Sequence, residues 1–190
     1  MAAPSSDCGR RAFCALLAAF LFAGCAQPKP AVDPVGDLLG LIDQRLALAE
    51  DVARSKWNSG APVEDLAREN EIVAAIGAEA PRYGLEPALT RDFFRAQIEA
   101  SKIVQNARLA AWRAEKLPKF SNAPDLQREI RPRLDRLTPE LLAALARARP
   151  ELRTTSAIKR LEQYSSVDSA RAIAIAPLRG ATANNQRSPQ

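Results

Sequence analysis

Hydrophobic residues recur at helical spacing along most of the chain. From residue 37 to residue 57 the apolar positions follow one another at steps of three and four, and Asn58-Ser59-Gly60 ends this pattern. A second, shorter helix is predicted to begin at Pro62, which suits a first turn, and to stop near Pro81. The third segment opens at Glu86-Pro87 and runs for about thirty residues without a breaker, so it is predicted to be the longest helix.

The C-terminal half shows the same spacing with more interruptions. After a loop at residues 117–123 and a break at Pro124, helical spacing resumes and continues past Thr138-Pro139, where either one kinked helix or two helices fit the sequence. A weaker helical region spans residues 156–176, and Ser165-Ser166 interrupts it. Since no alternating strand pattern occurs, the predicted fold class is all-α, a helical bundle with two long helices and several shorter ones.

Residues 1–26 have the three-part pattern of a secretory signal, with Arg10-Arg11 near the start, then an apolar run, then small residues. The run of about a dozen apolar residues is too short for a helix to cross a bilayer core of roughly 30 Å, so no membrane span is expected. Cleavage after Ala26 would release a periplasmic or secreted protein. Phe22-Ala23-Gly24-Cys25 resembles a bacterial lipoprotein box, and cleavage before Cys25 would leave a membrane-anchored periplasmic lipoprotein instead.

The remaining residues, about 165 in number, are enough for one domain. A proline-containing flexible leader is predicted at residues 27–34. The domain is predicted to span residues 35–177, and the polar residues 178–190 are predicted to form a disordered tail.

Composition removes several classes of chemistry. The chain has no histidine, and its three cysteines, at positions 8, 14 and 25, lie in the N-terminal stretch. A Ser-His-Asp triad, a Cys-His pair and a cysteine zinc site are therefore excluded from the domain, and no metal is expected. The net charge of +5 becomes +4 once the signal, with two arginines and one aspartate, is removed. Because basic and acidic residues are interspersed and aromatic residues are few, nucleic-acid binding is not expected.

Charged and polar residues among the apolar positions are the candidates for chemistry. Arg45 and Lys56 are eleven residues apart, which places them on nearly the same helix face, about 16 Å apart along the axis. A lone cation on a helix is most often solvated or in a surface ion pair that contributes less than about 1 kcal/mol. Spacing alone therefore supports only a bundle that could hold an anion between its helices. Three further clusters are Asp65, Arg68 and Glu69; Ser101 and Gln105; and Arg128, Arg131, Arg133 and Arg136.

The order of these residues resembles the all-helical chorismate mutases, in particular their secreted, periplasmic gamma subclass. The intervals match: eleven from Arg45 to Lys56, twelve from Lys56 to Arg68, and four from Ser101 to Gln105. The resemblance covers residues 38–145. It implies an isomerase, an intramolecular transferase, that rearranges chorismate to prephenate in the biosynthesis of phenylalanine and tyrosine. It also implies a homodimer and a reaction that needs no cofactor, metal or covalent intermediate.

Such a rearrangement needs the flexible substrate held in a compact conformer and donors preplaced for the charge that develops on the ether oxygen. The resemblance implies that Arg45 and Arg68 bind substrate carboxylates. Lys56 and Gln105 would donate to the ether oxygen from opposite sides, and Arg45, Lys56 and Gln105 are the residues expected to act in catalysis. Because Gln105 is an amide, it needs no proton in order to donate, so activity is expected to persist at mildly alkaline pH.

The remaining roles implied by the resemblance concern substrate binding. Ser101 would help to bind a carboxylate, Glu69 would accept a hydrogen bond from the substrate hydroxyl, and Asp65 is a weaker candidate nearby. A further arginine is expected, for which Arg131 fits best and Arg128 is the alternative. The alternative function is a non-catalytic periplasmic binding module or lipoprotein with the same fold.

Overall fold

The computed structural model describes residues 33–183, and every regular element in this part of the chain is helical. The predicted all-α fold class is therefore confirmed. The two long helices are α1 (Pro34–Ser59) and α3 (Pro87–Ala114), and α3 is the longer, as predicted. Among the described residues, no helix is both long and apolar enough to cross a membrane. The predicted signal, the lipoprotein box with Cys25 and the last seven residues of the predicted tail lie outside the described residues.

Helix α1 begins earlier than its apolar pattern. The side chain of Asp33 accepts a hydrogen bond from the backbone N–H of Gly36 (3.0 Å), and Pro34 occupies the first helical position, where its missing N–H is no loss. Pro34, the last residue of the predicted leader, is buried in α1. At the other end Gly60 has a left-handed φ of 73°, and its N–H donates to the carbonyl of Lys56 (2.8 Å). The helix therefore ends at the predicted break.

Helix α2 (Leu66–Glu79) begins later than the predicted start at Pro62. The cause is a side-chain cap: Oδ1 of Asp65 accepts the backbone N–H of Arg68 (3.1 Å), and Oε1 of Glu69 accepts the N–H of Asp65 (3.2 Å). Two otherwise unsatisfied backbone donors are thereby paired. Pro62 lies instead in the loop that joins α1 to α2.

One continuous helix, α4 (Arg131–Ala148), passes through Pro139, so this segment forms one helix and not two. Pro139 has no N–H to donate to the preceding turn. The hydroxyl of Thr138 donates to the carbonyl of Leu134 (3.0 Å) beside it. A single π-helical turn, Leu126–Ile130, leads directly into α4 and makes Arg131 its first residue.

Three short helices form the weak helical region predicted near the C-terminus: α5 (Thr155–Ser165), which ends at the predicted interruption, α6 (Ser169–Ala174) and α7 (Ala176–Ala183). Asp168 separates the first two, because its side chain caps α6 by accepting the N–H of Arg171 (2.8 Å). Helix α7 includes Leu178, which is fully buried. The helical part thus extends past residue 178, where the tail was predicted to begin.

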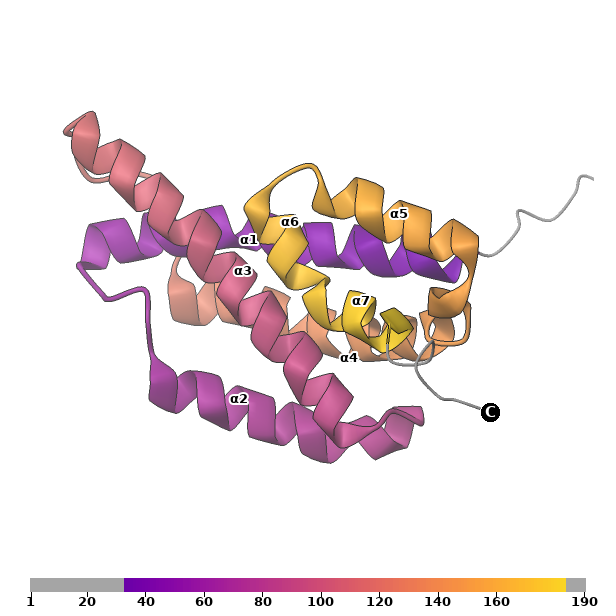
Figure 1. Ribbon diagram of the computed structural model, residues 1–190. Helices are drawn as coiled ribbons and strands as arrows, with labels where there is room; N and C mark the ends of the chain where they lie inside the picture. Colours follow the sequence, from indigo (N-terminus) through magenta and orange to yellow (C-terminus); the bar gives the residue numbers. More distant parts are fainter. Residues whose placement is uncertain (1–32, 184–190) are drawn as a thin grey trace, which may run out of the picture. The chain divides into compact units, whose positions relative to one another are not determined.

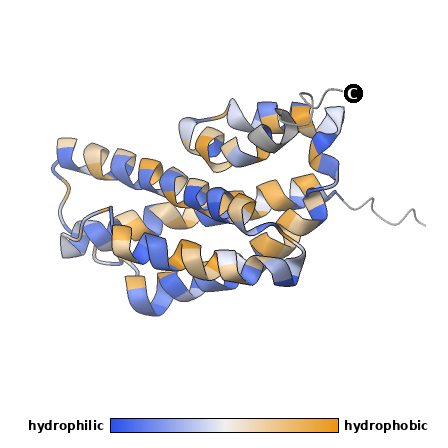
Figure 2. Ribbon diagram, turned by 60° about the horizontal axis from the view of Figure 1, so that its bottom comes forward, coloured by the Kyte–Doolittle hydropathy of each residue, from blue (hydrophilic) through white to orange (hydrophobic). Residues whose placement is uncertain are grey.

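Helix α1 packs against both α3 and α4, while α2 and α6 each pack against α3 (Figure 1). Hydrophobic and hydrophilic residues alternate around the long helices, as amphipathic packing requires (Figure 2). In the main core Phe93 and Phe94 are fully buried, with ring centroids 5.3 Å apart in an edge-on arrangement. A second, smaller cluster contains the rings of Trp57, Trp112 and Phe120.

Candidate active site

A cavity of about 530 Å³ lies between α1, the loop before α2, α2 itself, α3 and the start of α4. Four polar side chains are buried in the described part of the chain: Arg45, Thr90, Gln97 and Gln105. Thr90 and Gln97 each donate to a backbone carbonyl, at 2.9 Å and 2.8 Å, and so stabilise the packing. Arg45 and Gln105 instead line the cavity. The Nε of Arg45 and the Oε1 of Gln105 are buried without a hydrogen-bond partner, as is the Oε1 of Gln97 outside the cavity.

The residues predicted from sequence to bind or transform a substrate meet in this one cavity. They come from α1, α2, α3 and α4 and from the cap of α2, so segments far apart in sequence supply them. Arg128, the alternative to Arg131, is exposed and is not among the residues that line the cavity. The lining includes all eight predicted residues: Arg45, Lys56, Asp65, Arg68, Glu69, Ser101, Gln105 and Arg131.

Arg45 is the deepest cation of the cavity, with only 8% of its surface exposed. Burial lowers the pKa of its guanidinium to about 10, although the nearby carboxylate of Asp135 opposes this shift. The group is still protonated at neutral pH. Because a buried charge without a close partner is unfavourable, this arginine is expected to pair strongly with an anion that enters the cavity.

Lys56 lies about three helical turns beyond Arg45 on the same helix, and its Nζ donates to the carbonyl of Val63 (2.7 Å). Burial lowers the pKa of this ammonium below its ordinary value, while the carboxylates of Glu69 and Asp65 oppose the shift. An ammonium has three N–H donors. One bond to Val63 therefore leaves two donors for a ligand.

Gln105 and Ser101 form the predicted pair four residues apart on α3. The Nε2 of Gln105 donates to the hydroxyl of Ser101 (3.0 Å), and Gln105 is 4% exposed. The amide nitrogen carries a second hydrogen, and the amide oxygen has no partner. This wall of the cavity thus offers uncharged donors and acceptors whose state does not change with pH.

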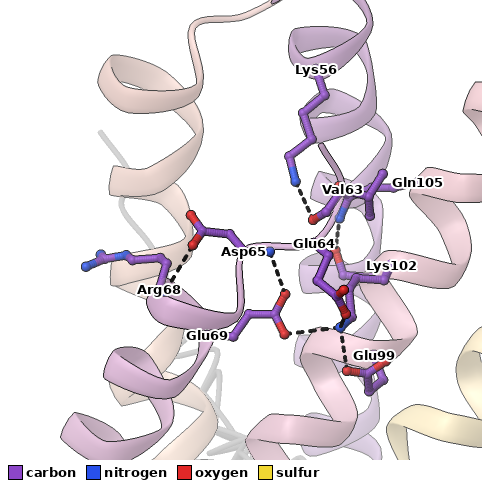
Figure 3. A network of polar contacts seen from close by, with 10 residues as sticks. Lys56, Val63, Glu64, Asp65, Arg68, Glu69, Glu99, Lys102 and Gln105 are labelled. Atoms are coloured by element: carbon purple, nitrogen blue, oxygen red, sulfur yellow. Dashed lines mark hydrogen bonds and ion pairs between the residues drawn. The ribbon is translucent and has the colours of Figure 1, made fainter. Parts of the chain in front are cut away.

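Glu69 stands at the junction of α2 and α3 (Figure 3). Its Oε1 accepts the N–H of Asp65, and its Oε2 lies 3.1 Å from the Nζ of Lys102. Burial disfavours the charged form of Lys102. Ion pairs with Glu99 and Glu69 outweigh this effect and raise the pKa of Lys102 above its ordinary value. Sequence reasoning missed Lys102, because its partner Glu69 lies on another helix, 33 residues earlier in the chain. Lys102 directly follows Ser101, a predicted site residue, and this adjacency is the sequence signal that could have identified Lys102.

Arg68 and Arg131 are held more loosely than Arg45. Arg68 pairs with Glu71 at 3.4 Å, its side chain is 45% exposed, and in Figure 3 its guanidinium points away from Gln105. Arg131 donates to the side-chain oxygen of Gln127 (2.6 Å). These two arginines have neutral or exposed partners that a ligand carboxylate can displace at low cost.

The chemistry of the lining fits a small anion that also carries a hydroxyl group. Guanidinium forks bind carboxylates in two-point fashion, and amide and ammonium donors stabilise a developing negative charge. The cationic residues outnumber the carboxylates, so the cavity attracts negative charge. The cationic lining residues are Arg45, Lys56, Arg68, Lys102 and Arg131, and the carboxylates are Glu64, Asp65, Glu69 and Asp135.

Residues 36–106 match a family model described as chorismate mutase type II. This stretch contains every predicted site residue except Arg131. The chain is 36% identical over 133 residues to a secreted chorismate mutase of Mycolicibacterium smegmatis, an alignment that covers 68% of this chain and 73% of the relative. It is 29% identical over 111 residues to a secreted chorismate mutase of Yersinia pestis, covering 58% of this chain and 59% of that protein.

Solved structures agree with the sequence relatives. The crystal structure of chorismate mutase from Burkholderia thailandensis superposes with a TM-score of 0.64 at 39% identity, covering 78% of this chain and 98% of that one. That of chorismate mutase from Burkholderia phymatum gives a TM-score of 0.67 at 32% identity, covering 77% and 96%. The likeness therefore extends over almost the whole of both solved chains.

Proposed function

The chain belongs to the chorismate mutase family and is a chorismate mutase, and we propose that the cavity containing Arg45, Lys56 and Gln105 is its active site. One observation carries this assignment: the cavity holds a buried arginine whose Nε has no partner, facing the same space as seven other predicted residues. The reaction is the rearrangement of chorismate, a dicarboxylate, to prephenate. In this reaction one bond breaks and another forms within a single molecule.

The first task of the site is to hold chorismate in its reactive conformer. Arg45 binds one carboxylate at the base of the cavity, where burial strengthens the charge-assisted hydrogen bonds. Arg68 and Arg131 bind carboxylate oxygens nearer the surface, and Ser101 adds a hydroxyl. Fixing both carboxylates replaces a search through many conformers by one bound geometry, which is a large part of such a rate enhancement.

The second task is to stabilise the negative charge that develops on the ether oxygen as its bond to carbon breaks. Lys56 on α1 and Gln105 on α3 line the same cavity from different helices and have N–H groups to spare. We assign them as the two donors to this oxygen. Because both are held in place before the substrate arrives, little reorganisation is needed during the reaction.

The substrate hydroxyl is assigned to Glu69. This carboxylate lines the cavity and is already held by two hydrogen-bond donors, the N–H of Asp65 and the ammonium of Lys102. Its remaining lone pairs can accept the hydroxyl. The side chain of Asp65 is engaged in capping α2, so Asp65 contributes chiefly by shaping this wall.

Loss of chorismate absorbance on addition of the purified protein tests the proposed function. Turnover is expected, together with accumulation of prephenate. Binding of chorismate without any turnover would instead support the alternative, a non-catalytic binding module with the same fold.

A location outside the cytoplasm is supported by the relatives that are named secreted chorismate mutases. Within that class we assign the chain to the secreted gamma subclass and to the periplasm, with residues 1–26 as a cleaved signal. Lipidation of Cys25 is the alternative. Mass spectrometry of the mature N-terminus distinguishes them: a chain that begins at Gln27 supports cleavage after Ala26, and a diacylglyceryl group on Cys25 supports the lipoprotein.

We also propose a homodimer, as the family resemblance implies. All eight predicted site residues line a cavity formed by a single chain, so catalysis in this proposal does not require a residue from a second subunit. Light scattering of the purified protein tests the dimer. The turnover per chain should not depend on protein concentration, even where the dimer dissociates.

A further inference from the structure

Lys102 is nearly buried and surrounded by carboxylates (Figure 3). Its side chain is 12% exposed, and its Nζ lies 2.7 Å from Glu99, 3.1 Å from Glu69 and 3.5 Å from Glu64. An ammonium group has three N–H donors. Three acceptors of this chain therefore occupy all of them, and none remains for a bound ligand.

The Glu69 carboxylate is fixed from two sides. Its Oε2 faces Lys102, and its Oε1 accepts the backbone N–H of Asp65. Its side chain is 18% exposed and lines the cavity. Since a carboxylate has about four lone-pair positions, these two bonds leave it able to accept a further hydrogen bond.

We propose that Lys102 is a positioning residue for the reaction: its ion pair holds the Glu69 carboxylate in the orientation in which it accepts the hydroxyl of chorismate. This inference rests on the proposed function, which assigns that hydroxyl to Glu69. Without Lys102, only the N–H of Asp65 would orient the carboxylate. Glu69 would also face the carboxylates of the substrate without its ion-pair partner, and only the more distant ammonium of Lys56 would offset its charge.

The same ion pair joins two helices, because Glu69 belongs to α2 and Lys102 to α3. A purely structural link would lower stability and leave the kinetics of the folded enzyme unchanged. A positioning role instead makes the kinetic effect of Lys102 depend on the presence of Glu69. A double-mutant cycle on turnover separates the two roles.

The cycle consists of Lys102→Met, Glu69→Gln and the double variant, each assayed for kcat and KM with chorismate after thermal unfolding has shown that it folds. Lys102→Met is expected to lower kcat/KM about tenfold, on the scale of one charge-assisted hydrogen bond. In the Glu69→Gln background the same change should have less than about a twofold effect. Lys102→Arg keeps the charge and should recover most of the loss.

Arg95→Met is the matched control, because Arg95 is an exposed cation of α3 that pairs with Asp92 at 3.2 Å and does not line the cavity. It should retain wild-type kinetics. Lys102→Gln, a second neutral variant, takes the place of Lys102→Met if the latter does not fold. Wild-type kinetics for the neutral variant, or an equal loss in both backgrounds, would overturn the inference. Absence of turnover in the unmodified protein would overturn the proposed function as well, whereas turnover there upholds that function whatever Lys102 does.

Discussion

Two hollows of similar size lie against α1 and α3. They differ in whether their charged side chains are paired with one another. The cavity proposed as the active site measures about 530 Å³, and the second hollow, a groove between α1, α3 and α6, measures about 460 Å³. In the groove Asp43 accepts hydrogen bonds from Tyr164 (2.8 Å) and Arg171 (2.9 Å). Arg108 pairs with Glu50 at 2.8 Å. The charges of the groove thus satisfy one another.

The cavity differs because two buried polar atoms of its lining have no hydrogen-bond partner within the protein. The Nε of Arg45 and the Oε1 of Gln105 are buried without partners, while no such atom occurs on a groove residue in the described part of the chain. Leaving a buried polar group unpaired costs about 1–3 kcal/mol. An unmet donor on a buried cation, the Nε of Arg45, thus distinguishes the cavity from the groove, although charged residues line both hollows.

The largest effect on turnover is expected at Lys56, which is assigned as a donor to the ether oxygen of the substrate. Lys56→Ala should lower kcat at least ~100-fold, the scale of removing one preorganised donor from such a site. Lys119→Ala, which removes an exposed lysine away from the cavity, is the control and should retain wild-type kcat. Steady-state kinetics with chorismate check both, and a loss of less than tenfold for Lys56→Ala would remove Lys56 from its assigned role.

Gln105→Glu should make activity depend on pH. In the wild-type enzyme the amide donates at any pH, so turnover should be retained from pH 5 to 7.5 and into the mildly alkaline range. It should fall only in the alkaline range, where Lys56, whose pKa burial lowers below the value of about 10.4 for an ordinary lysine, and Arg45, with a pKa of about 10, lose their charge. A glutamate donates only when protonated, so the variant should lose about tenfold in kcat for each pH unit above the pKa of the new carboxyl.

Measuring kcat for both enzymes between pH 5 and 9 checks the role of the amide. Recovery of kcat in Gln105→Glu at low pH would support this role. A steep loss of wild-type turnover between pH 5 and 7.5 would contradict it.

Arg131→Ala should lower kcat/KM about 10- to 100-fold, as expected for the loss of a hydrogen bond between charged groups. Arg128→Ala should have less than a twofold effect, because Arg128 is exposed and does not line the cavity. If Arg128→Ala proves the more damaging of the two, the assignment of Arg131 is wrong.

The smallest effect on catalysis is expected in the groove. Tyr164→Phe removes the hydrogen bond to Asp43, which Arg171 still contacts, so the free energy of unfolding should fall by about 1 kcal/mol. Turnover should be unchanged. Urea denaturation checks the free energy of unfolding, and steady-state kinetics on the same preparation check turnover. An altered kcat would show that the groove and the cavity are coupled.

Periodicity was sufficient to predict the fold class and the long helices, because their apolar faces are continuous. It failed where a single side chain decides a boundary. Pro62 suits a helix start, but the cap made by Asp65 determines where α2 begins. At Pro139 the pattern fitted either one kinked helix or two helices, and α4 continues through it as one. Leu178 looked like part of a polar tail, yet it is buried by tertiary packing that no local pattern encodes.

The eight residues predicted from the family resemblance all line one cavity, because their spacing along the helices places them on faces that meet there. Lys102 was not predicted, since its significance comes from contacts with Glu69 and Glu64 on a distant segment. Asp135 was missed for the same reason, because it lies on α4, whereas Arg45, whose charge it stabilises, lies on α1. Pairwise electrostatics between helices cannot be read from the sequence of either helix alone.

The most direct test compares one arginine from each hollow, Arg45→Met and Arg171→Met, for turnover and for thermal stability. Arg45→Met should lower kcat/KM for chorismate by ~100-fold or more and leave the melting temperature equal or higher, because it removes a buried charge that lacks a close partner. Arg171→Met should lower the melting temperature by a few degrees and leave kcat/KM unchanged, because it breaks ion pairs with Asp43 and Asp168. The opposite pattern, with activity lost in the groove variant and retained in Arg45→Met, would contradict the assignment of the cavity as the active site.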